Sequence, residues 1–137
     1  NVVEKLVKSE GDIVIAYDPD WKGIWSARFD DPLSDAESFS IDVNNKVVEI
    51  GAKVDDIAKI QGQYMGLLKF TPNGWRQVLS YLSRCDSSSI DVMDMTLLLS
   101  SLVRDGIRVD AVSTDDCWYE VDTESDLKVS SNMKRVE

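Results

Sequence analysis

The stretch Asp12-Ile13-Val14-Ile15-Ala16-Tyr17 decides the fold class. It is almost continuously apolar, which is typical of a strand buried on both faces of a sheet. Before it, Val2, Val3 and Leu6 recur at helical spacing, and Gly11 marks the end of that helix. A helix that leads into a buried strand is typical of α/β proteins, so the sequence predicts a sheet flanked by helices.

The remaining elements are predicted from periodicity and turn residues. Alternating apolar residues at 39–43 and at 48–50 flank Asn44-Asn45, a pair that suits a tight hairpin because asparagine tolerates positive φ. Further strands are predicted at 64–70, 107–112 and 117–121, and helices at 75–82, at 95–103 and from Thr123 onward. Residues 21–37 have no clean period and are predicted to form an ordered loop. The prediction is a single domain, 1–137, with a mixed sheet flanked by helices.

Composition narrows the chemistry that is possible. The 137 residues include 25 Asp and Glu against 15 Lys and Arg, a net charge of −10, which disfavours nucleic acid and anionic membranes as partners. There is no histidine, so zinc sites of the usual kind and Ser-His-Asp or Cys-His catalysis are excluded. Cys85 and Cys117 lie far apart and form no CxxC motif. Without an apolar run of about 18 residues, a cytoplasmic location is the expectation.

The most informative functional stretch is Trp118-Tyr119-Glu120-Val121-Asp122-Thr123. If it is extended, Trp118, Glu120 and Asp122 share one face. Asp122 would then lie at a strand end, where α/β enzymes place their ligands, with Thr123 capping the next helix. A carboxylate there is a good ligand for Mg²⁺. The alternative is that Asp122 and Asp126 cap the helix and face solvent.

This stretch is similar to the closing motif of nucleotidyltransferases that act on sugar phosphates, choline phosphate and related phosphorylated or phosphonate acceptors. Other segments resemble the choline-phosphate and phosphonate cytidylyltransferase-like branch in the same order. They are Ile15-Ala16-Tyr17-Asp18-Pro19-Asp20-Trp21, Arg28, Asp35-Ala36-Glu37, Gln63-Tyr64-Met65-Gly66-Leu67-Leu68-Lys69-Phe70 and Asp94-Met95-Thr96. The fold that this resemblance implies is the C-terminal half of a Rossmann-like nucleotidyltransferase.

The resemblance also implies an activity. It is nucleotidyl transfer from a nucleoside triphosphate, with CTP favoured, to a small phosphorylated or phosphonate acceptor, with release of pyrophosphate. Asp122 would hold Mg²⁺ together with an earlier aspartate of the family. Arg28 would contact the anionic end of the acceptor, because a guanidinium suits bidentate contacts to phosphate. The alternative for Arg28 is a surface pair with Asp30 or Asp31.

An acceptor that also carries an amine would need a second set of contacts. Trp21, Trp25 and Tyr64 are candidates, since aromatic faces attract ammonium groups. Asp94 could pair with a primary amine, and Lys53 is a further candidate for the anionic group. Phosphocholine and 2-aminoethylphosphonate are acceptors of this kind. The alternative for each aromatic residue is packing in the core.

One departure from the family pattern is large. The glycine-rich loop, Arg-Leu pair and lysine that bind the triphosphate have no counterpart, since Gly11 and Gly23 form no such loop. The expectation is therefore a C-terminal portion whose parent protein is an enzyme but which is inactive alone, completed by a missing N-terminal segment or a second chain. Two alternatives remain: a non-catalytic binding or regulatory module that retains half of the fold, and an unrelated acidic α/β domain with a chance resemblance.

Overall fold

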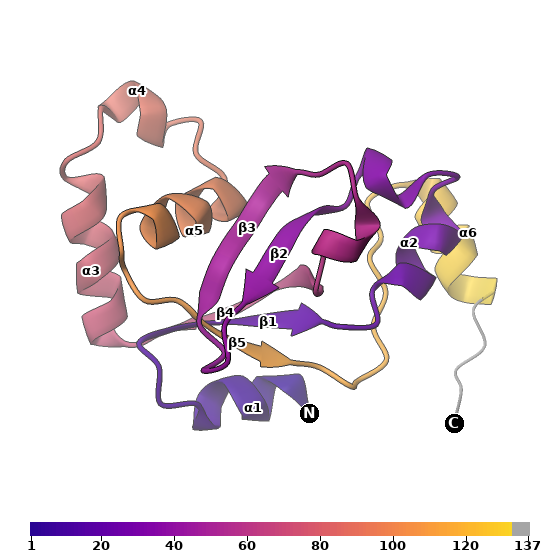
Figure 1. Ribbon diagram of the computed structural model, residues 1–137, viewed down its shortest axis with the longest axis horizontal. Helices are drawn as coiled ribbons and strands as arrows, with labels where there is room; N and C mark the ends of the chain where they lie inside the picture. The colour runs from indigo at the N-terminus through magenta and orange to yellow at the C-terminus, as the bar shows by residue number, and fades with distance from the viewer. Residues whose placement is uncertain (133–137) are drawn as a thin grey trace.

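The chain combines helices and strands in a computed structural model that describes residues 1–132 (Figure 1). The helices are α1 (Val2–Lys8), α2 (Lys22–Arg28), α3 (Pro72–Leu82), α4 (Ser87–Ile90), α5 (Met95–Arg104) and α6 (Glu124–Asn132). The strands are β1 (Ile13–Asp18), β2 (Glu37–Ile41), β3 (Val47–Lys53), β4 (Gln63–Phe70) and β5 (Asp110–Ser113). Short 3-10 turns cover Pro32–Ser34 and Ile57–Lys59. No helix of the described part combines the length and apolar character needed to cross a bilayer.

The main sheet has the strand order β4-β1-β5. β1 pairs antiparallel with β4 and parallel with β5, so the mixed α/β sheet predicted from the sequence is confirmed. The β2–β3 hairpin forms a second sheet beside β5. Two backbone hydrogen bonds of 2.8 Å join it to the β5 region, from Val47 N to Val109 O and from Ala111 N to Asn45 O.

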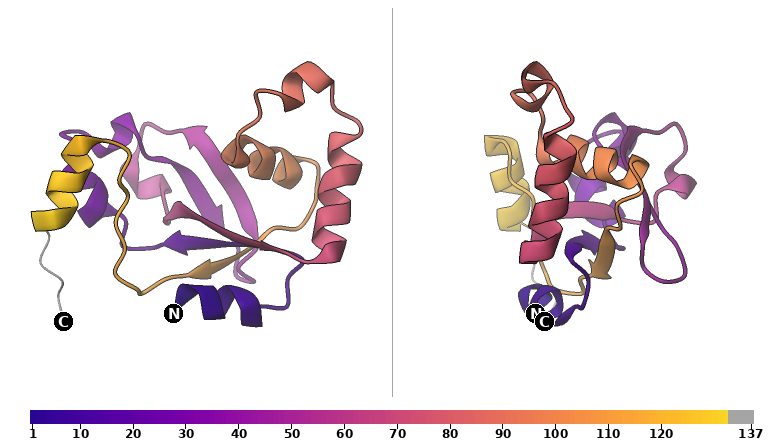
Figure 2. Two further views of the ribbon diagram at one scale, coloured as in Figure 1. Left: turned by 180° about the vertical axis from the view of Figure 1, so that it is seen from behind. Right: turned by 90° about the vertical axis from the view of Figure 1, so that its left-hand side faces the viewer.

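Both faces of β1 are covered, which explains its continuous apolar sequence. Val14 and Ala16 pack against Val2 and Leu6 of α1. Ile13 and Ile15 face the larger core, which α3, α5 and the hairpin complete. Figures 1 and 2 show α1 on one side of β1 and the hairpin with α5 on the other. The other buried members of the larger core are Phe39, Val47, Ile50, Val78, Leu98, Leu99, Leu102, Val109 and Ala111.

Several boundaries differ from the sequence prediction. Residues 21–37 are not a loop, because α2 and a 3-10 turn form within them. α2 has seven residues, too few for a periodic pattern, and Trp21 and Trp25 hold it by packing edge to face, 5.8 Å apart. The strand predicted at 117–121 is absent, and residues 114–122 contain no helix or strand. The hairpin is confirmed, with Asn45 at φ 58°. Residues 133–137 of the predicted domain lie outside the described part.

β4 forms one edge of the main sheet. It pairs with β1 and with no other strand of residues 1–132. Leu67 on β4, and Trp75 and Leu79 on α3, are exposed apolar side chains of this region. The association that an exposed apolar edge favours remains a prediction.

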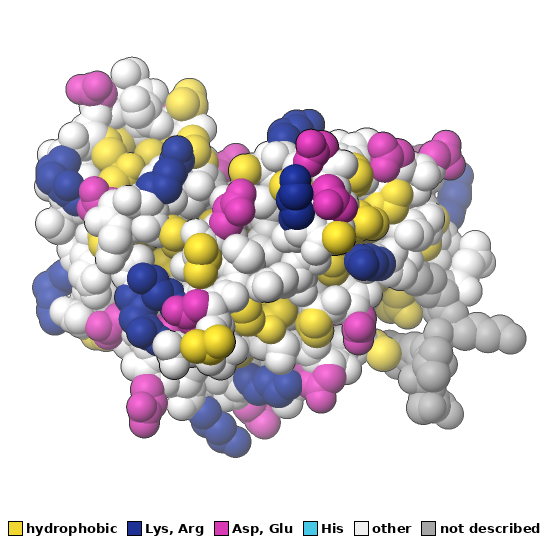
Figure 3. All heavy atoms as spheres, viewed as in Figure 1, with side chains coloured by type: hydrophobic (Ala, Val, Ile, Leu, Met, Phe, Trp, Pro, Cys, Tyr) yellow, Lys and Arg dark blue, Asp and Glu magenta, His cyan; other side chains and the backbone are white. Residues whose placement is uncertain are grey.

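Surface charge is mixed on the face seen in Figure 1. Lysine and arginine side chains lie among aspartates and glutamates rather than in one block (Figure 3). Among the described residues, exposed ion pairs join Lys5 with Asp115, Lys59 with Asp55, and Arg84 with Asp105. This face therefore offers no continuous basic surface among the described residues, in keeping with the net charge of −10.

Gly74 and Gly23 provide a matched test of the packing of α3 against the start of β1. A Cβ at Gly74 would lie 2.2 Å from the backbone oxygen of Asp12, whereas a Cβ at Gly23 would meet nothing within 4 Å. We expect Gly74→Ala to lower the free energy of unfolding by about 1–3 kcal/mol, because α3 must move away from β1. Gly23→Ala should raise it by roughly 0.5–1 kcal/mol through helix propensity. Urea unfolding monitored by tryptophan fluorescence measures both. Equal effects at the two positions would contradict the packing described.

Candidate functional site

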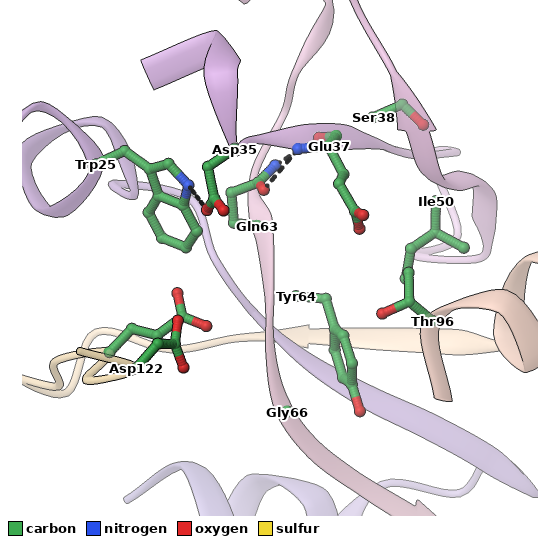
Figure 4. A pocket seen from close by; sticks show the side chains of 11 residues that line it. Trp25, Asp35, Glu37, Ser38, Ile50, Gln63, Tyr64, Gly66, Thr96 and Asp122 are labelled. Atoms are coloured by element: carbon green, nitrogen blue, oxygen red, sulfur yellow. Dashed lines mark hydrogen bonds between the residues drawn. The ribbon is translucent and has the colours of Figure 1, made fainter. Parts of the chain in front are cut away.

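A cavity of ≈ 280 Å³ lies where the main sheet, the hairpin and the segment after β5 meet (Figure 4). Its lining residues are Trp25, Asp35, Glu37, Ser38, Ile50, Gln63, Tyr64, Gly66, Thr96, Glu120 and Asp122. Figure 4 shows the carboxylates of Asp35, Glu37 and Asp122 directed toward the space between them. Four carboxylates line it and no lysine or arginine of residues 1–132 does, so its described lining is strongly negative.

Gln63, the first residue of β4, fixes one side of the cavity. Its buried side chain accepts a hydrogen bond from Glu37 N at 3.0 Å and donates to Glu37 O at 2.6 Å. The amide thus bonds to the start of β2 as a neighbouring strand would. Trp25 Nε1 donates to Asp35 Oδ2 at 3.0 Å on the same side. These contacts place the carboxylates of Asp35 and Glu37 at the cavity.

Gly66 shapes the floor through backbone geometry. The β1–β4 register runs from Ile15↔Leu68 to Tyr17↔Tyr64, which leaves three residues of β4 opposite one of β1. Gly66 lies in this bulge at φ 79°, a conformation that side chains with a Cβ disfavour. Beside it, burial raises the pKa of Tyr64 to about 12, so its hydroxyl remains a hydrogen-bond donor at neutral pH.

Arg28, at the end of α2, lies behind the opposite wall. Its Nη1 is 2.7 Å from Glu120 Oε2, its Nη2 is 2.7 Å from Asp122 Oδ2, and its Nε is 3.0 Å from Asp126 Oδ1. The side chain is 2% exposed. Its guanidinium also lies over the rings of Trp25 and Phe29, 5.5 and 4.9 Å from their centroids. Arg28 is therefore paired with carboxylates distant in sequence and not with Asp30 or Asp31.

Asp126 joins Arg28 to the start of α6. Its Oδ2 accepts from Thr123 N at 2.9 Å, Thr123 Oγ1 at 2.8 Å and Asp122 N at 3.2 Å. Thr123 Oγ1 in turn accepts from Asp126 N at 3.2 Å, which confirms Thr123 as the helix cap. The hydrogen bonds from Arg28 and Thr123 hold the pKa of Asp126 far below its ordinary value. The carboxylate therefore remains charged in this buried position.

Trp118 anchors the same segment farther back. Its Nε1 donates to the buried Asp18 Oδ2 at 2.9 Å, and its ring lies 6.3 Å from that of Trp25. Trp118, Glu120 and Asp122 therefore all contact residues of β1 or α2, as their alternation predicts, although the segment is not a strand. Glu120 is partly desolvated there, and burial raises its pKa against the lowering effect of Arg28.

The structure brings some of the predicted binding residues to the cavity and not others. Trp25 and Tyr64 line it. Trp21 is 0% exposed and packs in a separate cluster with Trp25, Ala36 and Ile60. Asp94 caps α5 by accepting from Leu97 N at 2.7 Å, and Lys53 is an exposed residue at the end of β3. Trp21, Asp94 and Lys53 do not line the cavity.

Eight lining residues had not been singled out as site residues, and four of these are Asp35, Glu37, Gln63 and Thr96. All four lie within the segments that resemble the cytidylyltransferase-like branch, so the motifs contained the necessary information. The pKa of Glu37 depends on charged neighbours both inside and outside the cavity lining. Burial, followed by the charges of Asp94 and Asp35, raises its pKa, whereas Lys53 lowers it.

The carboxylates fit Mg²⁺ if the substrate supplies further ligands. No group of three or more His, Cys, Asp or Glu in residues 1–132 is arranged to hold a metal ion. Mg²⁺ commonly uses one or two protein carboxylates and completes its octahedron with water and substrate phosphates. Asp122 meets this requirement, because its side chain is 65% exposed at the cavity wall and its bond to Arg28 uses Oδ2.

The Arg28 cluster makes a stability prediction. Arg28→Met removes the cation that pairs with three carboxylates, one of them buried, and should lower the free energy of unfolding by about 3–5 kcal/mol. Arg84→Met is the matched control. Arg84 also pairs with an aspartate, at 2.6 Å, and lies over a tyrosine ring, but it is 58% exposed. Its loss should cost less than about 1 kcal/mol. Comparable losses in thermal and urea unfolding would contradict the importance given to Arg28.

Comparison with known proteins agrees with the motifs. No protein-family model matches the chain. Among characterised proteins, CTP:phosphoglutamine cytidylyltransferase of Campylobacter jejuni is 32% identical over 133 residues, which is 93% of this chain. The chain spans about half of that relative, 52% of its length. The resemblance to nucleotidyltransferases is thereby confirmed: the chain matches a cytidylyltransferase along nearly all of its own length.

Proposed function

We propose that this chain is part of a nucleotidyltransferase that transfers a cytidylyl group from CTP to a small phosphorylated or phosphonate acceptor. One observation carries the proposal. Four of the segments that resemble the family lie far apart in sequence, yet all four contribute to the lining of one cavity: Asp35-Ala36-Glu37, the β4 strand, Thr96 and the Glu120–Asp122 stretch. A chance match in sequence gives no reason for this convergence.

The chemistry requires positioning more than bond-making groups. An oxygen of the acceptor's phosphate or phosphonate forms a bond to the α-phosphorus of CTP, the bond to the β-phosphate oxygen breaks, and pyrophosphate leaves. Catalysis of such a transfer rests on alignment and on neutralisation of the phosphate charges. Mg²⁺, when bound, supplies that neutralisation. The chain's contribution is Asp122, which presents a carboxylate to the metal, with Glu120 beside it on the same wall.

The acceptor pocket favours a cationic group on the acceptor. Asp35 and Glu37 lie on the wall facing Asp122, and Trp25 and Tyr64 add aromatic surface. Carboxylates and aromatic faces together suit an ammonium group. The acceptor that this combination fits carries a phosphate-like group at one end and an amine at the other. Phosphocholine and 2-aminoethylphosphonate have this form, and the relative's name gives phosphoglutamine.

The first test measures turnover. The protein, in its native length, is incubated with CTP, Mg²⁺ and each of the three acceptors, and pyrophosphate release is followed. Asp122→Asn should lower the rate by about 100-fold or more, because the carboxylate proposed to hold the charge-neutralising metal is lost. Asp91→Asn is the control, since Asp91 is exposed at the end of α4, away from α2 and α6. Absence of pyrophosphate release by the wild type, or full activity of Asp122→Asn, would refute the proposal.

The second test concerns the acceptor's amine. We expect phosphocholine to bind more tightly than an alkyl phosphate without the amine, in titration calorimetry. Glu37→Gln should weaken binding of phosphocholine by about tenfold and leave the alkyl phosphate unaffected, because the quaternary ammonium group loses the Coulombic attraction of a nearby carboxylate. Glu49→Gln, at an exposed position of β3 outside the cavity, is the control. Equal affinity for the two ligands would rule out an amine subsite, and binding without turnover would favour the non-catalytic alternative.

A further inference from the structure

The wall that carries Glu120 and Asp122 has no secondary structure of its own. Residues 114–122, between β5 and α6, form neither helix nor strand. In a strand, ladder hydrogen bonds would fix the direction of each side chain. Residues 114–122 lack such ladder hydrogen bonds where they form the cavity wall. The positions of the two carboxylates must therefore depend on contacts made by side chains.

Arg28 supplies the contact for both carboxylates. It binds Glu120 through Nη1 and Asp122 through Nη2, each at 2.7 Å. The planar guanidinium fixes the relative position of the two groups, which a flexible ammonium does not do. It also offsets the repulsion between two like charges held on one wall.

Arg28 is itself immobilised. Its Nε bonds to Asp126 Oδ1 at 3.0 Å, and the rings of Trp25 and Phe29 flank the guanidinium. The side chain is 2% exposed and is not among the residues that line the cavity. In this arrangement the guanidinium lies behind the carboxylates, and an acceptor in the cavity meets Glu120 and Asp122 first.

Asp126 holds the same wall through the backbone. Its Oδ2 accepts from the backbone N of Asp122 at 3.2 Å and of Thr123 at 2.9 Å. Asp122 is thus fixed at its side chain by Arg28 and at its backbone by Asp126, and these two residues bond to each other. The three residues form a closed set of hydrogen bonds.

We propose that Arg28 and Asp126 are positioning residues, which hold Glu120 and Asp122 in the cavity wall and act through them without touching the acceptor. This inference rests on the proposed nucleotidyl transfer. It differs from the role that the family resemblance suggests for Arg28, a direct contact to the acceptor's anionic end. The two roles make different kinetic predictions.

The test compares Arg28→Lys and Asp126→Asn with the wild type and with Arg84→Lys. Arg84 pairs with Asp105 and lies over Tyr81 but is remote from the cavity lining, so it controls for loss of any Arg–Asp pair. Thermal unfolding first establishes that each variant is folded. Three quantities are then measured: kcat and acceptor KM at several Mg²⁺ concentrations, affinity for Mn²⁺ by electron paramagnetic resonance, and hydrogen exchange of residues 114–123.

Positioning predicts a specific pattern. Both variants should lose about 10- to 100-fold in kcat or in metal affinity, as is usual when a group that orients a metal ligand is changed. Acceptor KM should stay within about twofold, because uniform substrate binding is not removed. Amide exchange at 118–123 should be faster in both variants than in the wild type. Arg84→Lys should match the wild type in all three measurements.

Other outcomes overturn the inference. A raised acceptor KM in Arg28→Lys, with unchanged kcat and exchange, would show that Arg28 contacts the acceptor. Wild-type behaviour of Asp126→Asn would remove Asp126 from the set. If the wild type releases no pyrophosphate, the proposed function fails separately. Unchanged Mn²⁺ affinity and unchanged exchange in both variants would then refute the positioning role as well.

Discussion

The interaction on which the site depends is the burial of one guanidinium among three carboxylates. Arg28 lies at the end of α2, and its partners come from the last third of the chain. Burying an arginine is costly unless its charge is compensated, and burying Asp126 carries the same requirement. The opposite charges of Arg28 and Asp126 offset the free-energy cost of burying each other. The pair thereby joins α2 to the start of α6, two elements between which β2, β3, β4 and β5 lie in sequence.

The contact between α2 and α6 matters because the main sheet ends before the segment that carries Glu120 and Asp122. β5 covers Asp110–Ser113, and the chain then crosses the edge of the molecule without regular structure until α6. Side-chain anchors replace the ladder: Trp118 bonds to Asp18 at the end of β1, and Arg28 bonds to the two carboxylates that follow. Both anchors connect the wall to β1 or α2, which the buried core holds firmly.

The composition of the cavity explains how an acidic chain can resemble enzymes that transfer phosphate groups. In the part of the chain that the structure describes, its lining contains Asp35, Glu37, Glu120 and Asp122 and no basic side chain. Such a wall repels bare phosphate but favours a cation, whether a divalent metal that bridges to phosphate or an ammonium group on the acceptor. Arg28, behind the wall, reduces the repulsion among these carboxylates without reversing the sign of the cavity.

The sequence by itself determined the class of fold and the family resemblance. The apolar run of β1, the Asn44-Asn45 turn and the periodic helices α3 and α5 carry strong local patterns, and the structure agrees with them. The capping of α6 by Thr123 was also local and also correct. These features depend on neighbouring residues, whose spacing in sequence fixes their spacing in space.

Tertiary structure alone decided how the site is assembled. That Trp21 is fully buried whereas Trp25 also lines the cavity depends on how α2, which Trp21 precedes, packs against its neighbours, and a helix of seven residues carries no readable period. The partners of Arg28 are more than 90 residues away, so no local pattern could distinguish them from Asp30 and Asp31. Glu37 reaches the cavity because the buried Gln63 bonds to its backbone across two strands. Contacts of this kind arise from packing, and a single sequence does not encode them as spacing.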